Sequence, residues 1–341
     1  MNHKEWTVEQ LASESIVDPL GDPVRIVNVP STVDPGLIDR ARRAALASHR
    51  VLVGVCRVPP ASGLTGLLTA LDVTLAPTAP HRCCVATADP DRAAGELADA
   101  VTAHPHAALV LARLLRWSGT LEVPAALDAE SLAYSTLLAG PEFARWSAGN
   151  TRRPPAAHPD PVLVDRTGDT LTITLNRPDR HNAYGRALRD ALVDALRVAE
   201  IDPTAERVVL RGAGPTFCSG GDLGEFGTTP DPVTAHLVRT GAGAAPPLHR
   251  LAGRVEVRVH GRCVGAGVEL PAFAARVVST RDATFRLPEL SMGLIPGAGG
   301  TVSLPRRIGR WRTFHLAGTQ HALDAATALA WRLVDELTDP E

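Results

Sequence analysis

Two glutamates in the second half of the chain stand among apolar residues, each beside a glycine-rich stretch. Glu269 occurs in the segment GAGVELPAF, and Glu289 occurs in RLPELSMGLIP. A carboxylate in an apolar setting is unfavourable unless it is paired or functional, and two carboxylates at one cavity drive their pKa values apart. The pair could therefore perform general acid–base chemistry. For Glu269 alone, a surface position at a helix N-terminus, where the helix dipole favours a negative charge, is the alternative.

Three glycine-bearing segments follow expected strands in the same half. They are FCSGGD at 217–222, GRCVGAGVEL at 261–270 and GLIPGAGG at 293–300. The second does not match the GxGxxG dinucleotide fingerprint, and a phosphate-binding loop with a lysine is excluded because Lys4 is the only lysine. Such loops expose backbone N–H groups that can bind an anion or a polarised carbonyl. Tight turns are the alternative for any one loop, and a weaker one for three together.

Other candidates for chemistry are less favoured. Cys218 and Ser219 are possible nucleophiles, but no histidine or acid neighbours them in sequence, so we interpret them as small loop residues. His260, at the end of a strand, is expected to pack or to cap. The histidines show no metal-ligand spacing, so we expect no metal. Five cysteines, an odd number without a CxxC pair, are typical of a reduced cytoplasm.

Composition excludes several classes of protein. The 341 residues are 45% hydrophobic and 21% charged, with a formal net charge of −2, which is ordinary for a globular chain of two or three domains. The absence of a basic stripe argues against a nucleic-acid surface. No apolar run approaches the roughly 20 residues of a membrane span, and the polar N-terminal segment lacks the apolar region of a signal peptide. We expect a cytoplasmic protein with small-molecule partners.

The elements that must position these residues form two halves, separated by the Pro-rich segment GNTRRPPAAHPDP at 149–161. In the first half we expect strands at 24–29, 51–56, 71–76 and 83–88, a helix at 37–50 with Asp34 as its N-cap, and Ala- and Leu-rich helices from residue 90 onward. In the second half we expect a hairpin at 162–178, a helix at 186–202, and strands at 207–214, 255–261 and 283–290. Strands that alternate with helices predict an α/β protein.

Taken together, the motifs of the second half resemble the enoyl-CoA hydratase/isomerase, or crotonase, superfamily. The resemblance runs from about residue 162 to 337 and is carried by LTITLNRPDRHNAY, RVVLRGAGPTFCSGGDL, VHGRCVGAGVELPAFA, ATFRLPELSMGLIPGAGGTVSLPRRIGR and ALDAATALAWRLVDEL, in the family's order and spacing. It implies a crotonase-like superhelical ββα core preceded by a smaller α/β plus helical domain. It also implies an acyl-CoA substrate and no separate cofactor, because coenzyme A is part of the substrate.

The resemblance also implies roles for individual residues, by motif position. The backbone N–H groups of Gly221 and Ala266 would form an oxyanion hole for the thioester oxygen. Glu269 and Glu289 match the two catalytic glutamates of the hydratases, and Gly297 matches the glycine whose N–H points to the reacting water. Coenzyme A is expected to contact Arg180, Ala183, Ser219, Gly220, Asp222, Leu223 and Gly265.

These roles favour an enoyl-CoA hydratase or dehydratase. A double-bond isomerase, which needs the oxyanion hole but mainly one glutamate, is an alternative, and a non-catalytic CoA-binding or scaffolding subunit is another. The chain ends at Glu341, where relatives continue with helices that cover the active site and build a trimer, and residues 90–148 resemble those helices. We therefore expect a degenerate crotonase-like α/β segment with a helical tail at 1–148, a linker at 149–161, and at 162–341 a core that lacks the usual C-terminal helices. A homo-oligomer, trimer or hexamer, is expected.

Overall fold

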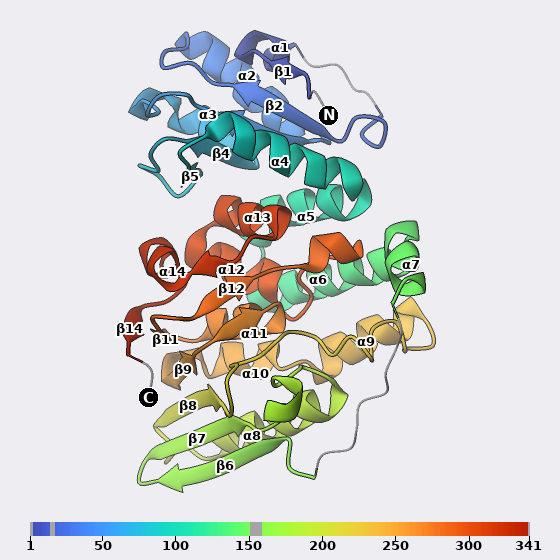
Figure 1. The fold of residues 1–341 in the computed structure, drawn as a ribbon, viewed down its shortest axis with the longest axis vertical. Coiled ribbons are helices and arrows are strands. Elements are labelled where there is room, and N and C mark those ends of the chain that lie inside the picture. Colours follow the sequence, from blue (N-terminus) through green and yellow to red (C-terminus); the bar gives the residue numbers. More distant parts are fainter. Residues whose placement is uncertain (1–2, 14–17, 151–158, 340–341) are drawn as a thin grey trace.

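The computed structural model describes residues 3–13, 18–150 and 159–339. The molecule is elongated, with the N-terminal sheet at one end, the hairpin of the second half at the other, and helices of both halves between them (Figure 1). Most of the predicted Pro-rich linker, residues 151–158, lies outside the described residues.

The N-terminal sheet has five parallel strands in sequence order. They are β1 (Glu5–Trp6), β2 (Val24–Asn28), β3 (Val51–Val55), β4 (Val73–Ala76) and β5 (Cys84–Ala86), and the intervening helices are α1 (Val8–Ala12), α2 (Pro35–Ala47) and α3 (Thr65–Ala70). Alternate side chains of a strand face opposite sides. Val27 and Leu52 pack with α1, α2 and α3, whereas Ile26 and Val53 join the large core shared with the second half. Both faces are therefore covered, which explains the apolar strand sequences.

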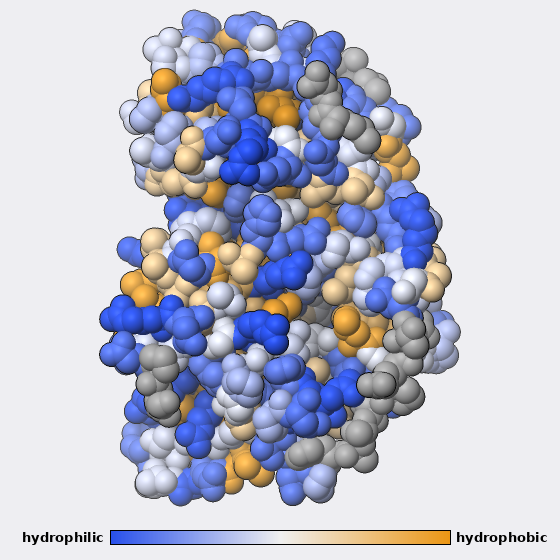
Figure 2. Space-filling model, viewed as in Figure 1, coloured by the Kyte–Doolittle hydropathy of each residue, from blue (hydrophilic) through white to orange (hydrophobic). Residues whose placement is uncertain are grey.

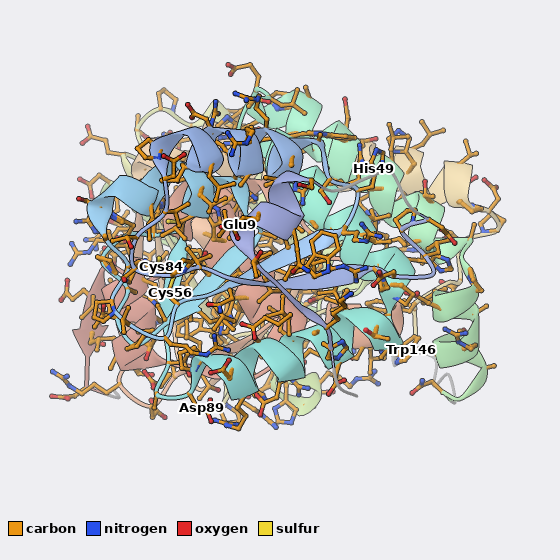
Figure 3. All side chains as sticks on the ribbon, turned by 90° about the horizontal axis from the view of Figure 1, so that it is seen from above. Glu9, His49, Cys56, Cys84, Asp89 and Trp146 are labelled. Carbon is orange, nitrogen blue, oxygen red and sulfur yellow. The ribbon has the colours of Figure 1, made fainter. Side chains whose placement is uncertain are left out.

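The small core on the outer face of this sheet also holds the cysteines of the first half. Cys56, Cys83 and Cys84 are buried there and free, and Figure 3, which looks down on the N-terminal sheet, shows Cys56 and Cys84 near one another. At the start of α2 the predicted N-cap is confirmed, because the Leu37 N–H donates to Asp34 Oδ2 at 2.9 Å.

Four helices of the first half form a layer between the N-terminal sheet and the second half. They are α4 (Pro90–Ala103), α5 (Pro105–Ser118), α6 (Val123–Leu138) and α7 (Pro141–Ala148), each with a proline in its first turn, where a missing N–H costs nothing. α4 packs on β2, β3 and β4 and on α13 (Arg310–Thr319), and α5 and α6 pack on α12 (Gly300–Ile308). Arg116 of α5 donates to buried Asp72 at 2.6 Å, which ties the layer to the N-terminal sheet.

The second half has a six-stranded sheet and a three-stranded sheet. The order of the first is β14 (Glu336–Thr338), β11 (Arg276–Thr280), β9 (Val255–Val259), β8 (Arg207–Gly212), β7 (Thr170–Leu175) and β6 (Val162–Thr167), and only the β6–β7 hairpin is antiparallel. The second contains β10 (Arg262–Val264), β12 (Thr284–Arg286) and β13 (Leu323–Asp324). The remaining helices are α8 (Arg186–Ile201), α9 (Pro232–Ala242), α10 (Ala245–Arg250), α11 (Ala266–Glu269) and α14 (Ala325–Trp331).

All the strands and helices expected from the sequence are present within a few residues of their predicted bounds. The surface in Figure 2 is mostly hydrophilic, with apolar side chains scattered over several elements on the visible face. Within the described ranges, no helix combines the length and the apolar character needed to cross a bilayer.

Candidate active site

The predicted glycine loops lie against one another at the ends of their strands. Cys218 pairs with Cys263 in a single parallel bridge, and the Val264 N–H donates to the Cys218 carbonyl at 3.0 Å. The approach is so close that a Cβ on Gly267 would come within 2.3 Å of that same carbonyl oxygen. Glycine is therefore required where the two loops meet.

Three residues of these loops line one cavity of about 500 Å³. They are Gly221, Ala266 and Gly297, each from a different glycine segment. Across the part of the chain that the structure describes, none of the backbone N–H groups of these three residues donates to a protein acceptor. Unpaired donors beside a cavity are suited to an oxygen that gains negative charge during a reaction.

The two predicted glutamates line the same cavity and differ in how they are held. Glu269, at the end of α11, is 2% exposed, and its Oε2 accepts hydrogen bonds from the N–H groups of Ala298 at 2.7 Å and Gly300 at 2.9 Å. Glu289 begins the short turn Glu289–Met292, and its buried Oε2 accepts no hydrogen bond from any described residue. One carboxylate is thus fixed to the backbone, and the other keeps an unsatisfied oxygen for a ligand.

Burial makes both carboxyl groups weaker acids than ordinary glutamate side chains. Desolvation, together with the negative charges of Glu289 and Glu130, holds the pKa of Glu269 well above its usual value of 4.5. Desolvation, with a smaller contribution from Glu130, raises the pKa of Glu289 to about 7. Because each ionised carboxyl opposes ionisation of its neighbour, the cavity retains protonated carboxyl near neutral pH. A protonated and an ionised carboxyl that line one cavity can exchange protons with a substrate.

The residues predicted to contact coenzyme A lie next to the cavity and do not line it. Arg180 pairs with Asp222 at 3.1 Å, and Asp222 Oδ1 also accepts the Gly224 N–H at 3.0 Å. The other members of this set are Ala183, which is buried, Leu223, which is 51% exposed, and Ser219, Gly220 and Gly265 on the meeting glycine loops. The structure therefore gathers the five predicted catalytic residues at one cavity and the CoA set on its border.

The less favoured candidates behave as small or capping residues. Burial raises the pKa of the Cys218 thiol to about 12, so it is not an available thiolate. His260 Nε2 lies 2.8 Å from the Gly214 carbonyl oxygen. No group of three or more histidine, cysteine or acidic side chains in the described ranges could hold a metal ion.

Comparison with known proteins identifies the family. Residues 166–341 match the enoyl-CoA hydratase/isomerase family. The chain is 34% identical over 175 residues to 1,2-epoxyphenylacetyl-CoA isomerase of Escherichia coli (strain K12). The aligned segment covers 50% of this chain and 67% of that protein. It is 30% identical over 198 residues to mevalonyl-coenzyme A hydratase SIDH of Beauveria bassiana (strain ARSEF 2860). This aligned segment covers 55% of this chain and 69% of the hydratase.

The chain belongs to the enoyl-CoA hydratase/isomerase family. Among solved structures it resembles DspI of Pseudomonas aeruginosa, with a TM-score of 0.50 and 28% identity over 54% of this chain and 70% of that one. The α/β fold with a crotonase-like core, expected from the sequence, is confirmed. Residues 1–165, including α6, lie outside the family match.

In this family member, α6 nonetheless contributes side chains to the cavity. Glu130 is 2% exposed and accepts hydrogen bonds from the N–H groups of Gly299 at 2.7 Å and Thr301 at 2.8 Å, and from the Thr301 hydroxyl at 2.7 Å. The Tyr134 ring lies against Gly297, since a Cβ on that glycine would come within 2.3 Å of the ring. The first half therefore completes the cavity wall within the same chain.

Sequence reasoning missed Glu130, Tyr134 and Arg239, a third cavity residue outside the predicted site. The sequence does contain a signal for Glu130. It interrupts a stripe of apolar or aromatic residues at helical spacing, and the structure buries these residues fully or in part: Val123, Ala126, Tyr134 and Leu137. An acid in such a stripe needs a buried partner. No sequence pattern marks Arg239, whose position depends on packing of α9 against α6.

Proposed function

We propose that this chain is an acyl-CoA enzyme that adds water to the double bond of a 2-enoyl-CoA, or removes water to form it. The observation that carries the proposal is the shared cavity. Two buried glutamates with raised pKa values line it together with three residues whose backbone N–H groups have no acceptor among the described residues. Donors for an oxyanion and a carboxyl pair for proton transfer are what this reaction needs.

In the proposed mechanism, the N–H groups of Gly221 and Ala266 bind the thioester oxygen. Negative charge builds on this oxygen as the α-carbon gains enolate character, and each such donor contributes roughly 2.7–4 kcal/mol to the transition state. The ionised member of the Glu269–Glu289 pair takes a proton from water, and the protonated member gives its proton to the α-carbon. Gly297 N–H would orient the water. The glutamates exchange protonation states in one turnover, and dehydration follows the same steps in reverse.

The proposed binding site for the rest of the substrate lies on the border of the cavity. We place the nucleotide end of coenzyme A near Arg180, Ala183 and the 219–223 loop, with Gly265 behind it. The partial exposure of that loop and its direct contact with the cavity loops support this position. The free, buried cysteines support the proposed cytoplasmic location. We also propose that the protein forms a homo-oligomer, a trimer or a hexamer.

The proposed domain organisation extends to the first half. We propose that residues 90–148 cover the active site from the N-terminal side, as helices do in relatives, and that 1–148 is a degenerate copy of the same fold. The packing of α5 and α6 on α12 supports the first part. Hydrogen bonds from Arg306 to the Ser118 carbonyl at 3.0 Å and to the Leu121 carbonyl at 2.6 Å support it as well.

A second candidate is a double-bond isomerase. It is favoured by the unequal glutamates, because Glu269 Oε2 is held by two backbone N–H groups whereas Glu289 Oε2 has no partner among the described residues. One free carboxylate suffices to move a proton between carbons of the acyl chain. The test is an absorbance assay with crotonyl-CoA and with a 3-enoyl-CoA. Loss of the conjugated-thioester absorbance from the first supports hydration, and gain of it from the second alone supports isomerisation.

A further inference from the structure

Arg239 of α9 lines the same cavity as the two glutamates. Its Cζ lies 4.3 Å from the centre of the Tyr134 ring, and that ring lies against Gly297. The guanidinium is therefore separated from the proposed reaction centre by a single aromatic side chain. A cation over an aromatic face is held in a defined plane.

The hydrogen bonds of Arg239 use only one of its three nitrogens. Nη1 donates to the Ser131 carbonyl at 3.2 Å, to Ser131 Oγ at 2.9 Å and to Ser135 Oγ at 3.2 Å. Nε and Nη2 donate to no acceptor among the described residues. These two nitrogens form the edge of the guanidinium that binds a carboxylate through two parallel hydrogen bonds.

The charge of Arg239 also lacks a direct counter-ion. No carboxylate of a described residue pairs with it, whereas Arg116 and Arg180, also partly buried, each pair with an aspartate. Desolvation lowers the pKa of Arg239, against opposing contributions from Tyr134 and Glu130. A partly desolvated cation with a free binding edge is stabilised by an anion that enters the cavity.

We infer that Arg239 binds an anionic group on the acyl chain, so that the preferred substrates are mono-CoA thioesters of dicarboxylic acids. This inference rests on the proposed function. The phosphates of coenzyme A are the other available anions, but the pantetheine arm separates them from the thioester. The residues proposed to contact coenzyme A lie on the loops that border the cavity, whereas Arg239, on α9, lines the cavity itself together with the two glutamates.

The test measures binding of saturated thioesters, which cannot react, by isothermal titration calorimetry. The probes are glutaryl- and adipyl-CoA, each paired with its neutral counterpart of equal length, valeryl- and hexanoyl-CoA. In the wild type, we expect at least one dicarboxylic thioester to bind about 10-fold or more tightly than its neutral partner, the scale of a charged hydrogen-bond pair. Arg239→Gln should abolish this preference and leave the neutral thioesters within about twofold of wild type.

Two further variants separate charge from geometry and from general effects. Arg239→Lys keeps the charge but loses the two-pronged edge, so the preference should shrink rather than vanish. Arg197→Gln, an exposed arginine of α8 that pairs with Asp194, should leave the preference unchanged. Circular dichroism and a melting temperature establish that each variant is folded.

The possible outcomes are distinct. Equal wild-type affinity for dicarboxylic and neutral thioesters would overturn the inference while the proposed function stands. Uniform weakening of all four thioesters in Arg239→Gln would also overturn it, because the arginine would then bind coenzyme A itself. Failure of the wild type to bind any thioester would remove the proposed function, and this inference with it.

Discussion

Glu130 and Glu269 bind alternate N–H groups at the start of α12. Glu269 accepts from Ala298 and Gly300, and Glu130 accepts from Gly299 and Thr301. The N-cap Gly299 has no side chain of its own to satisfy these donors. A carboxylate from each half of the chain therefore fixes the segment that follows Gly297.

We predict that Glu130→Gln shifts the pH dependence of activity. The charge of Glu130 helps to raise the pKa of Glu289. Removing it should lower that pKa, so that the ascending limb of the kcat/KM profile moves to lower pH. Glu142→Gln is the matched control. Glu142 is also buried, and it accepts hydrogen bonds at the start of a helix from the N–H groups of His106 at 2.8 Å and Ala107 at 3.2 Å. It does not line the cavity. An identical profile in wild type and Glu130→Gln would rule out this positioning role.

Gly221→Pro should abolish turnover, because proline has no N–H to offer the thioester oxygen. Cys218→Ala and Ser219→Ala in the same loop should reduce the rate at saturating substrate only mildly, since neither side chain takes part in the proposed proton transfers and Ser219 is assigned only a contact with coenzyme A. The rates are measured with saturating enoyl-CoA after each variant is shown to be folded. A large loss in Cys218→Ala beside an active Gly221→Pro would instead indicate covalent catalysis.

Local patterns made the core and its loops predictable from the sequence. Alternating residues mark the β6–β7 hairpin, and glycine marks the places where backbones meet closely, at Gly267 beside the Cys218 carbonyl and at Gly220 beside the Val264 carbonyl. The contribution of Glu130 was not predictable in this way. Its hydrogen-bond partner Gly299 is 169 residues away, and no local pattern records contacts between segments so far apart.

The stability of the protein should depend on Glu289 in a pH-dependent way. The pKa of this glutamate is about 7 in the folded state, against an ordinary value of 4.5. Below pH 4.5 the carboxyl is protonated in both the folded and the unfolded state, and its burial as an anion costs no stability. As the pH rises towards about 7, this cost in the free energy of unfolding grows. Glu289→Gln removes this cost. Urea unfolding should show the variant gaining up to about 3 kcal/mol on wild type between about pH 4 and about pH 8. A difference that does not change with pH would contradict the raised pKa.

The second half should depend on the first for its active form. The fragment 162–341 would expose the face of α12 that α5 and α6 cover, and large exposed apolar surfaces cause aggregation. We expect this fragment alone to be insoluble or inactive, and addition of the fragment 1–150 to restore part of the activity. Sedimentation and an enoyl-CoA assay check both statements. A soluble and fully active 162–341 fragment would show that α6 is dispensable for the site.

The most direct test of the account is the rate of crotonyl-CoA hydration in the wild type, Glu269→Gln and Glu289→Gln. The reaction is followed by loss of the conjugated-thioester absorbance, and acyl-CoA binding is measured in parallel. We predict turnover by the wild type and a fall of at least about 10²-fold in each variant, the scale of a lost acid–base group, with binding retained. Hydration at the wild-type rate by either variant, or no reaction of the wild type with any enoyl-CoA that it binds, would contradict the account.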